Sequence, residues 1–501
     1  MSGPSSPSGP SGPRVLVVDV GTSSLRAGVV DAGAVTHVHR RELLPTSPAP
    51  GFVEFDATAM ADAVLTVARA ASEDAARDGK EPVSGLGITN QRASTIVWDR
   101  KTGTPVGPGI GWQDLRTVGM CLALADQGIR LAPNESATKV AMLLDLADPE
   151  RTGDLCFGTV DSWVAWTLSE GALHVTDETN AGVTGLVTSD GGSWNTTRLE
   201  ALRIPAGVLP EIVDSAGVIG AATALPGSPV ICGMAGDQQA SLVGQGCTRP
   251  GLAKVTFGTG GMLDMCVGPT RPSFERRGGA GTFPIAAWRR AGRITWGVEA
   301  IMLSAGTCVE WLRDDLGILE DAAESEKVAA SVSDSGDVWF VPALLGLGTP
   351  VWDYGARGTF VGITRGTGRA EMVRAVLEGV AHRGADLLEA AETDTGLSVP
   401  ALRVDGGMSA NGVFVQALAD ACGRAVEVSP VTEATTLGAA YLAGLALGHY
   451  ADEDEIARAW QPARVVEPMV SERLRHERRQ RWLDARERSR RTVPELSALD
   501  F

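Results

Sequence analysis

The feature of this sequence that most constrains its fold is a strand–turn–strand pattern that occurs twice, half a chain apart. Two stretches, VLVVDVGTSSLRAGVVD at 15–31 and GLAKVTFGTGGMLDMCVG at 251–268, each place a glycine–threonine turn between two apolar runs. Short apolar runs bounded by turn residues are typical of β-strands. The repeat predicts an internal duplication, in which two similar domains face one another.

Strand and helix patterns alternate through both copies, which indicates α/β layers. Residues 56–80 predict a helix with Asp56 as its N-cap, and residues 83–89 and 94–99 predict strands. The charged C-terminus is expected to form a solvated helix, with a basic interaction patch as the alternative. We therefore expect a disordered tail over 1–13, an N-terminal domain over 14–249, a C-terminal domain over 250–460 and a charged helical tail over 461–501.

The composition argues against several classes of protein. The chain has 501 residues and a formal net charge of −17, which argues against nucleic-acid partners and acidic membrane surfaces. No apolar run approaches the roughly 20 residues of a membrane span, and the first residues lack the features of a signal peptide. Seven cysteines without a CxxC pair favour buried free thiols in a reducing cytoplasm over disulfides or a zinc site.

The first turn carries groups that suit a phosphate. Its glycine allows an anion to approach closely, and Thr22, Ser23 and Ser24 add hydroxyl donors. Asp19, near the end of the preceding strand, would repel a phosphate unless Mg²⁺ lay between them. One such hairpin is more often structural, but the second copy and a third glycine turn at 404–411 favour nucleotide binding. The chain contains neither a P-loop nor the glycine-rich loop of protein kinases.

Asp237 is a candidate for the acid–base residue of a phosphoryl transfer. It follows the small-residue stretch GMAG and precedes an apolar, helix-like run. On this segment alone, an N-cap aspartate is the more ordinary interpretation. The functional alternative is a general base that takes the proton from a hydroxyl as the oxygen attacks phosphorus. Such a base contributes about 10²–10⁴-fold to the rate.

Taken together, the motifs resemble those of the FGGY carbohydrate kinases, and most closely those of the glycerol kinases, from about residue 15 to 450. The matching stretches include DVGTSSLRAGVVD, GITNQRASTIVWDRKTG, GWQDLRT, HVTDETNAG, AGDQQASLVGQ, FGTGGML, LRVDGGMSAN and EATTLGAAYLAGLALG. The resemblance implies two actin-like (RNase H-like) domains with an interdomain cleft, ATP and Mg²⁺ as cofactors, a small polyol as substrate, and a homodimer or homotetramer.

The same resemblance gives each candidate residue a role. Asp237 matches the catalytic base, and Asp19 matches the Mg²⁺-associated acid. The other nucleotide-side positions are Thr22, Ser23, Ser24, Arg26, Thr259, Gly260, Gly306, Val309, Glu310, Gly407 and Asn411. The polyol-side positions are Arg92, Ala93, Trp112, Asn134, Asp237, Gln238 and Met262.

The polyol side departs from the glycerol kinase pattern at three positions. Ala93 stands where glutamate is usual, Asn134 where tyrosine is usual, and Met262 where phenylalanine is usual. Loss of a carboxylate that accepts a substrate hydroxyl costs on the order of 1–3 kcal/mol. Phosphorylation of glycerol to glycerol 3-phosphate is the first expectation. Another polyol or a ketose (tetritol, pentitol or pentulose) is one alternative, and a non-enzymatic actin-like ATP-binding module is another.

Overall fold

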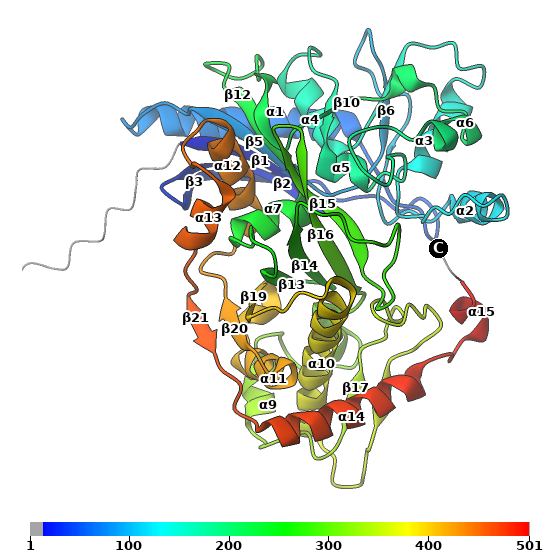
Figure 1. Ribbon diagram of the computed structural model, residues 1–501, viewed down its shortest axis with the longest axis vertical. Coiled ribbons are helices and arrows are strands. Elements are labelled where there is room, and N and C mark those ends of the chain that lie inside the picture. Colours follow the sequence, from blue (N-terminus) through cyan, green and yellow to red (C-terminus); the bar gives the residue numbers. More distant parts are fainter. Residues whose placement is uncertain (1–13, 500–501) are drawn as a thin grey trace, which may run out of the picture.

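A single sheet of thirteen strands runs the length of the computed structural model, which describes residues 14–499 (Figure 1). The tail predicted over 1–13 lies outside the described residues. In spatial order the strands are β21 (Arg464–Val466), β20 (Ala425–Val428), β19 (Ala401–Asp405), β13 (Ala253–Phe257), β14 (Gly261–Gly268), β16 (Arg293–Met302), β15 (Phe283–Arg290), β11 (Ala216–Ala221), β12 (Val230–Gly236), β5 (Gly85–Asn90), β1 (Val15–Val20), β2 (Ser24–Asp31) and β3 (Ala34–Glu42).

The sheet consists of two halves with the same strand order. β1 pairs antiparallel with β2 and parallel with β5, while β13 pairs antiparallel with β14 and parallel with β19. β3 and β16 pair with β2 and β14, and β12 and β20 lie beyond β5 and β19. The predicted duplication is therefore present, and the two glycine–threonine turns occupy equivalent places in the N-terminal and C-terminal halves.

Two helices near the middle of the molecule join the halves. α12 (Ala434–Ala446) comes late in the chain, yet it packs on β1, β5 and β12 of the N-terminal half (Figure 1). α7 (Asp237–Gly244) follows β12 but contacts β14 of the C-terminal half. The two helices cross closely, since a Cβ atom at Gly244 would lie 1.9 Å from the carbonyl oxygen of Ala434. Each of these two helices thus contacts strands of one half, while the chain connects the helix to the other half.

Other helices pack on the apolar cores of the two halves. α1 (Ala57–Arg77) and α4 (Val160–Leu168) pack on the apolar core of the N-terminal half. Asp56 caps α1 as predicted, because its carboxylate accepts hydrogen bonds from two backbone N–H groups of the first turn. α10 (Arg369–Thr395) and α11 (Gly412–Cys422) occupy the corresponding position on the C-terminal half.

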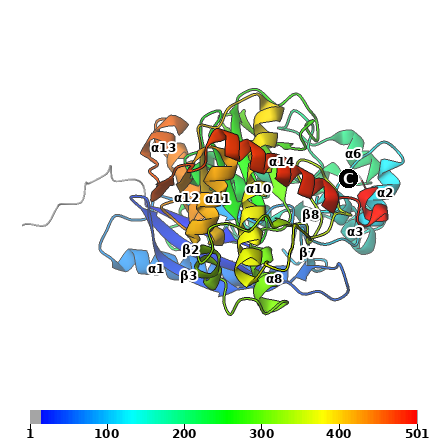
Figure 2. The same ribbon diagram turned by 90° about the horizontal axis from the view of Figure 1, so that it is seen from below.

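α14 (Glu472–Ser489) is the charged helix that the sequence predicts, but it is not fully solvated. It crosses α10 and α11 (Figure 2), and the Trp482 side chain is completely buried. Arg479 Nη2 and Arg486 Nη1 lie 2.8 and 3.0 Å from the carboxylate of Asp386 in α10. Apolar contact and charge neutralisation therefore bury one side of a helix whose sequence is strongly charged.

All seven cysteines are buried and unpaired, as the sequence predicts. No helix among residues 14–499 is both long and apolar enough to cross a membrane.

The remaining strands and helices are short. The other strands are β4 (Glu54–Phe55), β6 (Ile96–Asp99), β7 (Gly109–Ile110), β8 (Leu155–Gly158), β9 (Val175–Asp177), β10 (Glu211–Val213), β17 (Trp339–Val341) and β18 (Thr359–Val361). The other helices are α2 (Val118–Ala125), α3 (Ala137–Ala147), α5 (Glu178–Gly182), α6 (Thr196–Ala201), α8 (Gly306–Asp314), α9 (Glu324–Ala330), α13 (Glu453–Ala459) and α15 (Pro494–Ser497).

Candidate active site

Asp237 lies at the junction between the last central strand of the N-terminal half and helix α7. β12 is almost wholly buried and ends at Gly236, and Asp237 is the first residue of α7. Gly236 is the N-cap, so the interpretation of Asp237 as an N-cap is wrong. The Gly236 N–H donates to the Thr179 hydroxyl at 2.8 Å, and the Gln238 N–H donates to Asp237 Oδ1 at 2.8 Å. These two bonds fix the backbone from which the carboxylate projects.

Arg92 lies beside this carboxylate. It follows β5, and its Nε is 3.6 Å from Asp237 Oδ1, while its Nη2 is 2.7 Å from Glu299 Oε2 on β16. A Cβ atom at Gly236 would lie 2.6 Å from Arg92 Cγ, so the close approach of Arg92 requires glycine there. Sequence reasoning missed Glu299, because only the packing of the two halves brings β16 to Arg92.

The electrostatic surroundings of Asp237 suit a general base. The side chain is 35% exposed, yet protein surrounds it closely enough that desolvation raises the pKa of Asp237 above its usual value. Asp19 adds to the rise, whereas Arg92 and Lys254 oppose it. Charges from both halves of the molecule therefore act on one carboxylate. A raised pKa brings an aspartate closer to the range in which proton transfer is efficient at neutral pH.

Asp19 lies on β1, and it is engaged by the side chain of Arg26. Arg26 Nη2 donates to Asp19 Oδ2 at 2.7 Å, and Arg26 Nη1 forms an ion pair with Glu433. The Thr436 hydroxyl of α12 lies 3.3 Å from the same Oδ2 atom. Within the described part of the chain, no hydrogen bond reaches Oδ1 of this largely buried carboxylate, and no cluster of three His, Cys, Asp or Glu residues could hold a metal.

The first glycine–threonine turn is a closed hairpin. The Gly21 N–H donates to the Ser24 carbonyl at 2.9 Å, and Ser24 begins β2. Thr22 is half-buried and Ser23 is exposed. The Thr22 hydroxyl accepts a hydrogen bond from Trp112 Nε1 at 3.3 Å, so this turn lies directly against the predicted polyol side.

Trp112, Ala93 and Asn134 lie outside the helices and strands, and one buried amine connects the first and the last of them. Lys139 Nζ donates to the carbonyls of Trp112 at 3.1 Å and Asn134 at 3.5 Å. Burial lowers the pKa of Lys139 to about 8, and sequence reasoning did not single this residue out. Ala93 is buried with a φ of +61°, and its carbonyl accepts a bond from the Ser136 hydroxyl at 2.9 Å. The Asn134 residue is exposed.

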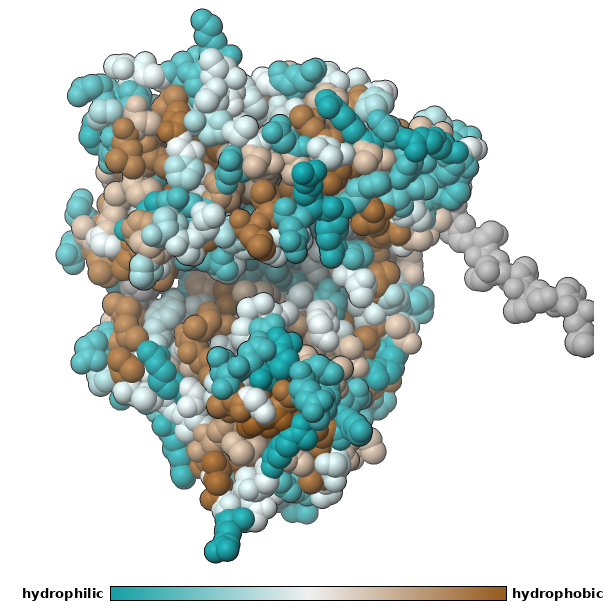
Figure 3. Space-filling model, turned by 180° about the vertical axis from the view of Figure 1, so that it is seen from behind, coloured by the Kyte–Doolittle hydropathy of each residue, from teal (hydrophilic) through white to brown (hydrophobic). Residues whose placement is uncertain are grey.

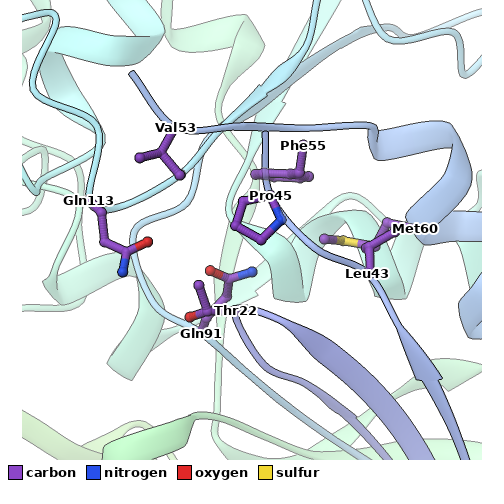
Figure 4. Close-up of a pocket in the computed structure, with 9 residues that line it drawn as sticks. Thr22, Leu43, Pro45, Val53, Phe55, Met60, Gln91 and Gln113 are labelled. Carbon is purple, nitrogen blue, oxygen red and sulfur yellow. The ribbon is translucent and has the colours of Figure 1, made fainter. Parts of the chain in front are cut away.

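A small cavity adjoins this region, and Thr22 is one of the residues that line it. It has a volume of about 10 Å³, close to the size of one water molecule. The polar ends of Thr22, Gln91 and Gln113 gather on one side, and apolar side chains such as Val53 and Phe55 close the other (Figure 4). The cavity is too small for a polyol, so it adds packing space beside the turn and no second substrate site.

Gln238 bonds across the boundary between the halves, and Met262 lies on the strand beside its partner. Lys254 Nζ on β13 donates to Gln238 Oε1 at 2.7 Å, and Lys254 is itself completely buried. Met262 lies on β14 directly opposite Thr256, two positions from the direct partner of Lys254. Because side chains two residues apart on a strand share a face, Met262 points to the same side of the sheet as that partner.

A larger cavity of about 500 Å³ lies in the C-terminal half, beside the second glycine–threonine turn. A hollow crosses the middle of the molecular surface between the upper and lower parts (Figure 3). The carbonyls of Gly258 and Thr259 accept hydrogen bonds from the N–H groups of Gly306 and Ala305, at the start of α8. The cavity brings together six of the predicted nucleotide-side residues: Thr259, Gly306, Val309, Glu310, Gly407 and Asn411. Gly260 belongs to the same turn, whereas Thr22, Ser23, Ser24 and Arg26 lie on the N-terminal half.

Two actin-like halves with a carboxylate between them define a class of two-domain sugar and polyol kinases. Sequence comparison agrees with this class. Residues 14–244 match the N-terminal domain of the FGGY family of carbohydrate kinases, and residues 253–447 match its C-terminal domain. The chain therefore belongs to the FGGY family of carbohydrate kinases, and the predicted α/β fold with two actin-like domains is confirmed.

Relatives along nearly the whole chain are named glycerol kinase. The glycerol kinase of Trichlorobacter lovleyi is 43% identical over 493 residues, which are 95% of this chain and 98% of that protein. Glycerol kinase 2 of Thermotoga maritima is 42% identical over 492 residues, with the same two coverages. Among solved structures, Plasmodium falciparum glycerol kinase with ADP superposes with a TM-score of 0.88 at 27% identity, covering 95% of this chain and 98% of that chain.

Proposed function

We propose that the chain is an ATP-dependent kinase that phosphorylates a primary hydroxyl of a small polyol, with glycerol 3-phosphate as the product from glycerol. The observation that carries the proposal is the convergence of both halves on Asp237. Arg92 and Asp19 act on it from the N-terminal half, and Lys254 acts on it from the C-terminal half. A carboxylate at such a junction can meet a substrate held on one half and a phosphate held on the other.

In the proposed reaction, Asp237 accepts the proton of the substrate hydroxyl while the hydroxyl oxygen attacks the γ-phosphorus of ATP. Arg92 and Gln238 bind the polyol beside this carboxylate, and Trp112 packs against the polyol. The bond from the γ-phosphorus to the bridging oxygen breaks, and ADP leaves with the negative charge. Closing of the two halves excludes water, which would otherwise compete with the polyol as the nucleophile.

The nucleotide is proposed to lie in the 500 Å³ cavity, with its phosphates at the second turn. Thr259 and Gly260 contribute to phosphate binding, Gly306, Val309 and Glu310 form one wall, and Gly407 and Asn411 lie on the adenine side. Thr22, Ser23, Ser24 and Arg26 complete the phosphate surroundings from the opposite half. This division follows the family resemblance and the grouping of these residues.

Mg²⁺ is proposed as the metal, with Asp19 as its protein ligand. The donor set fits, because Mg²⁺ is usually bound by one or two carboxylates together with phosphate and water oxygens. Asp19 offers one carboxylate whose Oδ1 atom receives no hydrogen bond within residues 14–499. Bound Mg²⁺ supplies charge neutralisation for the phosphates.

Glycerol is the first choice of substrate because relatives at 42–43% identity over most of their length carry that name. The departures at Ala93, Asn134 and Met262 favour a second candidate, a kinase of a tetritol, pentitol or pentulose. Brucella ovis xylulose kinase has the same fold, with a TM-score of 0.82 at 25% identity over 97% of this chain and 99% of that chain. A cytoplasmic location and a homodimeric or homotetrameric assembly remain predictions.

A substrate panel tests the proposal. The purified protein is incubated with ATP, Mg²⁺ and, separately, glycerol, tetritols, pentitols and pentuloses, and ADP release is measured with the product identified. We expect fastest turnover with glycerol. Fast turnover of a four- or five-carbon substrate without turnover of glycerol would select the second candidate. ATP binding without phosphorylation of any member would leave the non-enzymatic actin-like module.

A further inference from the structure

Three charged side chains form a row across three neighbouring strands of the C-terminal half. Lys254 on β13 lies directly opposite Asp264 on β14, and Asp264 lies directly opposite Glu299 on β16. Side chains that are directly opposite one another on adjacent strands point to the same face of the sheet. Lys254 and Asp264 are completely buried, and Glu299 is 6% exposed. We call these three residues the charge row.

Both ends of the charge row contact residues of the proposed polyol site in the other half. Lys254 Nζ lies 2.8 Å from Asp264 Oδ2 and donates to Gln238 Oε1 at 2.7 Å. Glu299 Oε2 lies 2.7 Å from Arg92 Nη2. Gln238 follows Asp237 in the chain, and Arg92 Nε lies 3.6 Å from Asp237 Oδ1. The row therefore ends on either side of the proposed base.

Stability alone gives a weak reason for burying these charges. Taking charged groups out of water is costly, and replacing buried ion pairs with apolar side chains is often neutral or stabilising. Orientation gives a stronger reason. The Lys254 ammonium has only donors, so the Gln238 amide must turn its oxygen toward it and keep its NH₂ group for another acceptor. A carboxylate at Glu299 similarly fixes the direction of the Arg92 guanidinium.

The side chain at position 93 strengthens this argument. Ala93 follows Arg92 in the chain and carries only a methyl group, so it offers the guanidinium no carboxylate. The acid that pairs with Arg92 at 2.7 Å comes from β16 of the opposite half. In this chain, therefore, the orientation of a polyol-side arginine depends on the C-terminal half.

We propose that Glu299 is a positioning residue for polyol binding, and that Lys254 and Asp264 extend the same function to Gln238. This inference rests on the proposed kinase function and deepens it. The C-terminal half shapes the polyol site as well as holding the nucleotide. Removing the Glu299 charge leaves Arg92 to swing toward Asp237, which weakens polyol binding and leaves the nucleotide cavity unchanged.

Steady-state kinetics of the full chain with glycerol and ATP test the inference. We expect Glu299→Gln to raise the KM for glycerol about tenfold, because the Arg92 guanidinium loses the carboxylate that lies 2.7 Å from it, with the KM for ATP changed less than about twofold. Glu427→Gln is a matched control. Glu427 on β20 is a carboxylate of the same sheet outside the charge row: its Oε2 lies 3.2 Å from Arg403 Nε, far from the proposed base in the sheet order. We expect this control to leave both KM values within about twofold of wild type.

An unchanged KM for glycerol in Glu299→Gln, or an equal rise in Glu427→Gln, would overturn the inference. If Glu299→Gln does not fold, Glu299→Asp replaces it, since it keeps the charge and shortens the side chain by one methylene. Glu299→Asp is then expected to raise the KM for glycerol by a smaller factor, and no rise would equally overturn the inference. Turnover by the wild type reports separately on the proposed function. A wild type that phosphorylates no substrate would contradict the proposed kinase activity, but it would not test the positioning role of Glu299.

Discussion

The two glycine–threonine turns occupy the same place in the two halves, but their surroundings differ. Beside the first turn, Asp19 is held by Arg26, and Arg26 is shared with Glu433. Beside the second turn lies the 500 Å³ cavity, and Thr256 takes the position that Asp19 has in the first copy. One backbone arrangement thus supports a charged, crowded site and an open one.

The same exchange continues on the neighbouring parallel strands. Asp19 of β1 lies opposite Thr89 of β5, whereas Thr256 of β13 lies opposite Asp405 of β19. The acid has changed strands between the copies, and burial raises the pKa of Asp405. The duplicated fold therefore fixes the positions at which functional side chains can lie. The residue types at those positions differ between the copies, and this difference suits one half to the reacting groups and the other to the nucleotide.

The largest expected effect concerns the residue between the halves. Asp237→Asn keeps the size of the side chain but removes the base, so we expect kcat to fall by about 10²–10⁴-fold. ATP binding should be unchanged, because Asp237 does not line the large cavity. Turnover is measured by ADP release, and nucleotide affinity by calorimetry. Retained turnover in this variant would remove Asp237 from the mechanism.

A second prediction concerns the open turn. A Cβ atom at Gly260 would lie 2.7 Å from the carbonyl oxygen of Met302, so Gly260→Ala must shift the turn. Such overpacking costs about 1–3 kcal/mol, and we expect the KM for ATP to rise about tenfold or more. In the control Gly119→Ala on α2, the added methyl meets no atom within 4 Å, so kinetics should stay near wild type. An unaltered KM for ATP in Gly260→Ala would place the phosphates elsewhere.

A third prediction concerns the crowded turn. Arg26→Gln leaves Asp19 and Glu433 close together without their shared cation, so we expect the free energy of unfolding to fall by about 1–3 kcal/mol. Urea unfolding measures the change. Arg77→Gln on α1 breaks only exposed ion pairs and should cost less than about 1 kcal/mol. Equal losses in the two variants would mean that Arg26 stabilises the folded protein no more than an exposed ion pair does.

The smallest expected effect is on pH dependence. Arg92 opposes the rise in the pKa of Asp237, so Arg92→Gln should raise that pKa further. The base acts only when deprotonated, so the acidic limb of kcat against pH should move to higher pH. The profile is measured at saturating polyol in both proteins. A shift to lower pH would show that Arg92 does not act on the titrating group.

Much of the fold follows from local patterns in the sequence. The duplicated hairpins, the Asp56 cap and the charged helix at the C-terminus were all predictable, because each depends on a few adjacent residues. The pairing of Lys254 with Asp264 could also have been found, since both stand four positions from a turn that spans 258–260. Counting outward from a hairpin turn gives direct partners without any knowledge of tertiary structure.

Contacts between the halves could not be predicted in this way. Glu299 is more than 200 residues from Arg92, and Glu433 is more distant still from Arg26. The packing of α12 on the N-terminal strands and the burial of Trp482 likewise depend on how distant segments meet. For Ala93, Asn134 and Met262, the resemblance marked the positions but not the partners.

A crystal structure of the protein with bound ADP and glycerol would show directly how the two halves divide the nucleotide and the polyol between them. We expect ADP in the cavity lined by Thr259, Gly407 and Asn411, with a terminal glycerol hydroxyl within hydrogen-bond distance of the Asp237 carboxylate. Nucleotide bound outside that cavity, or glycerol bound where the Asp237 carboxylate cannot reach its hydroxyls, would contradict the division of labour between the two halves.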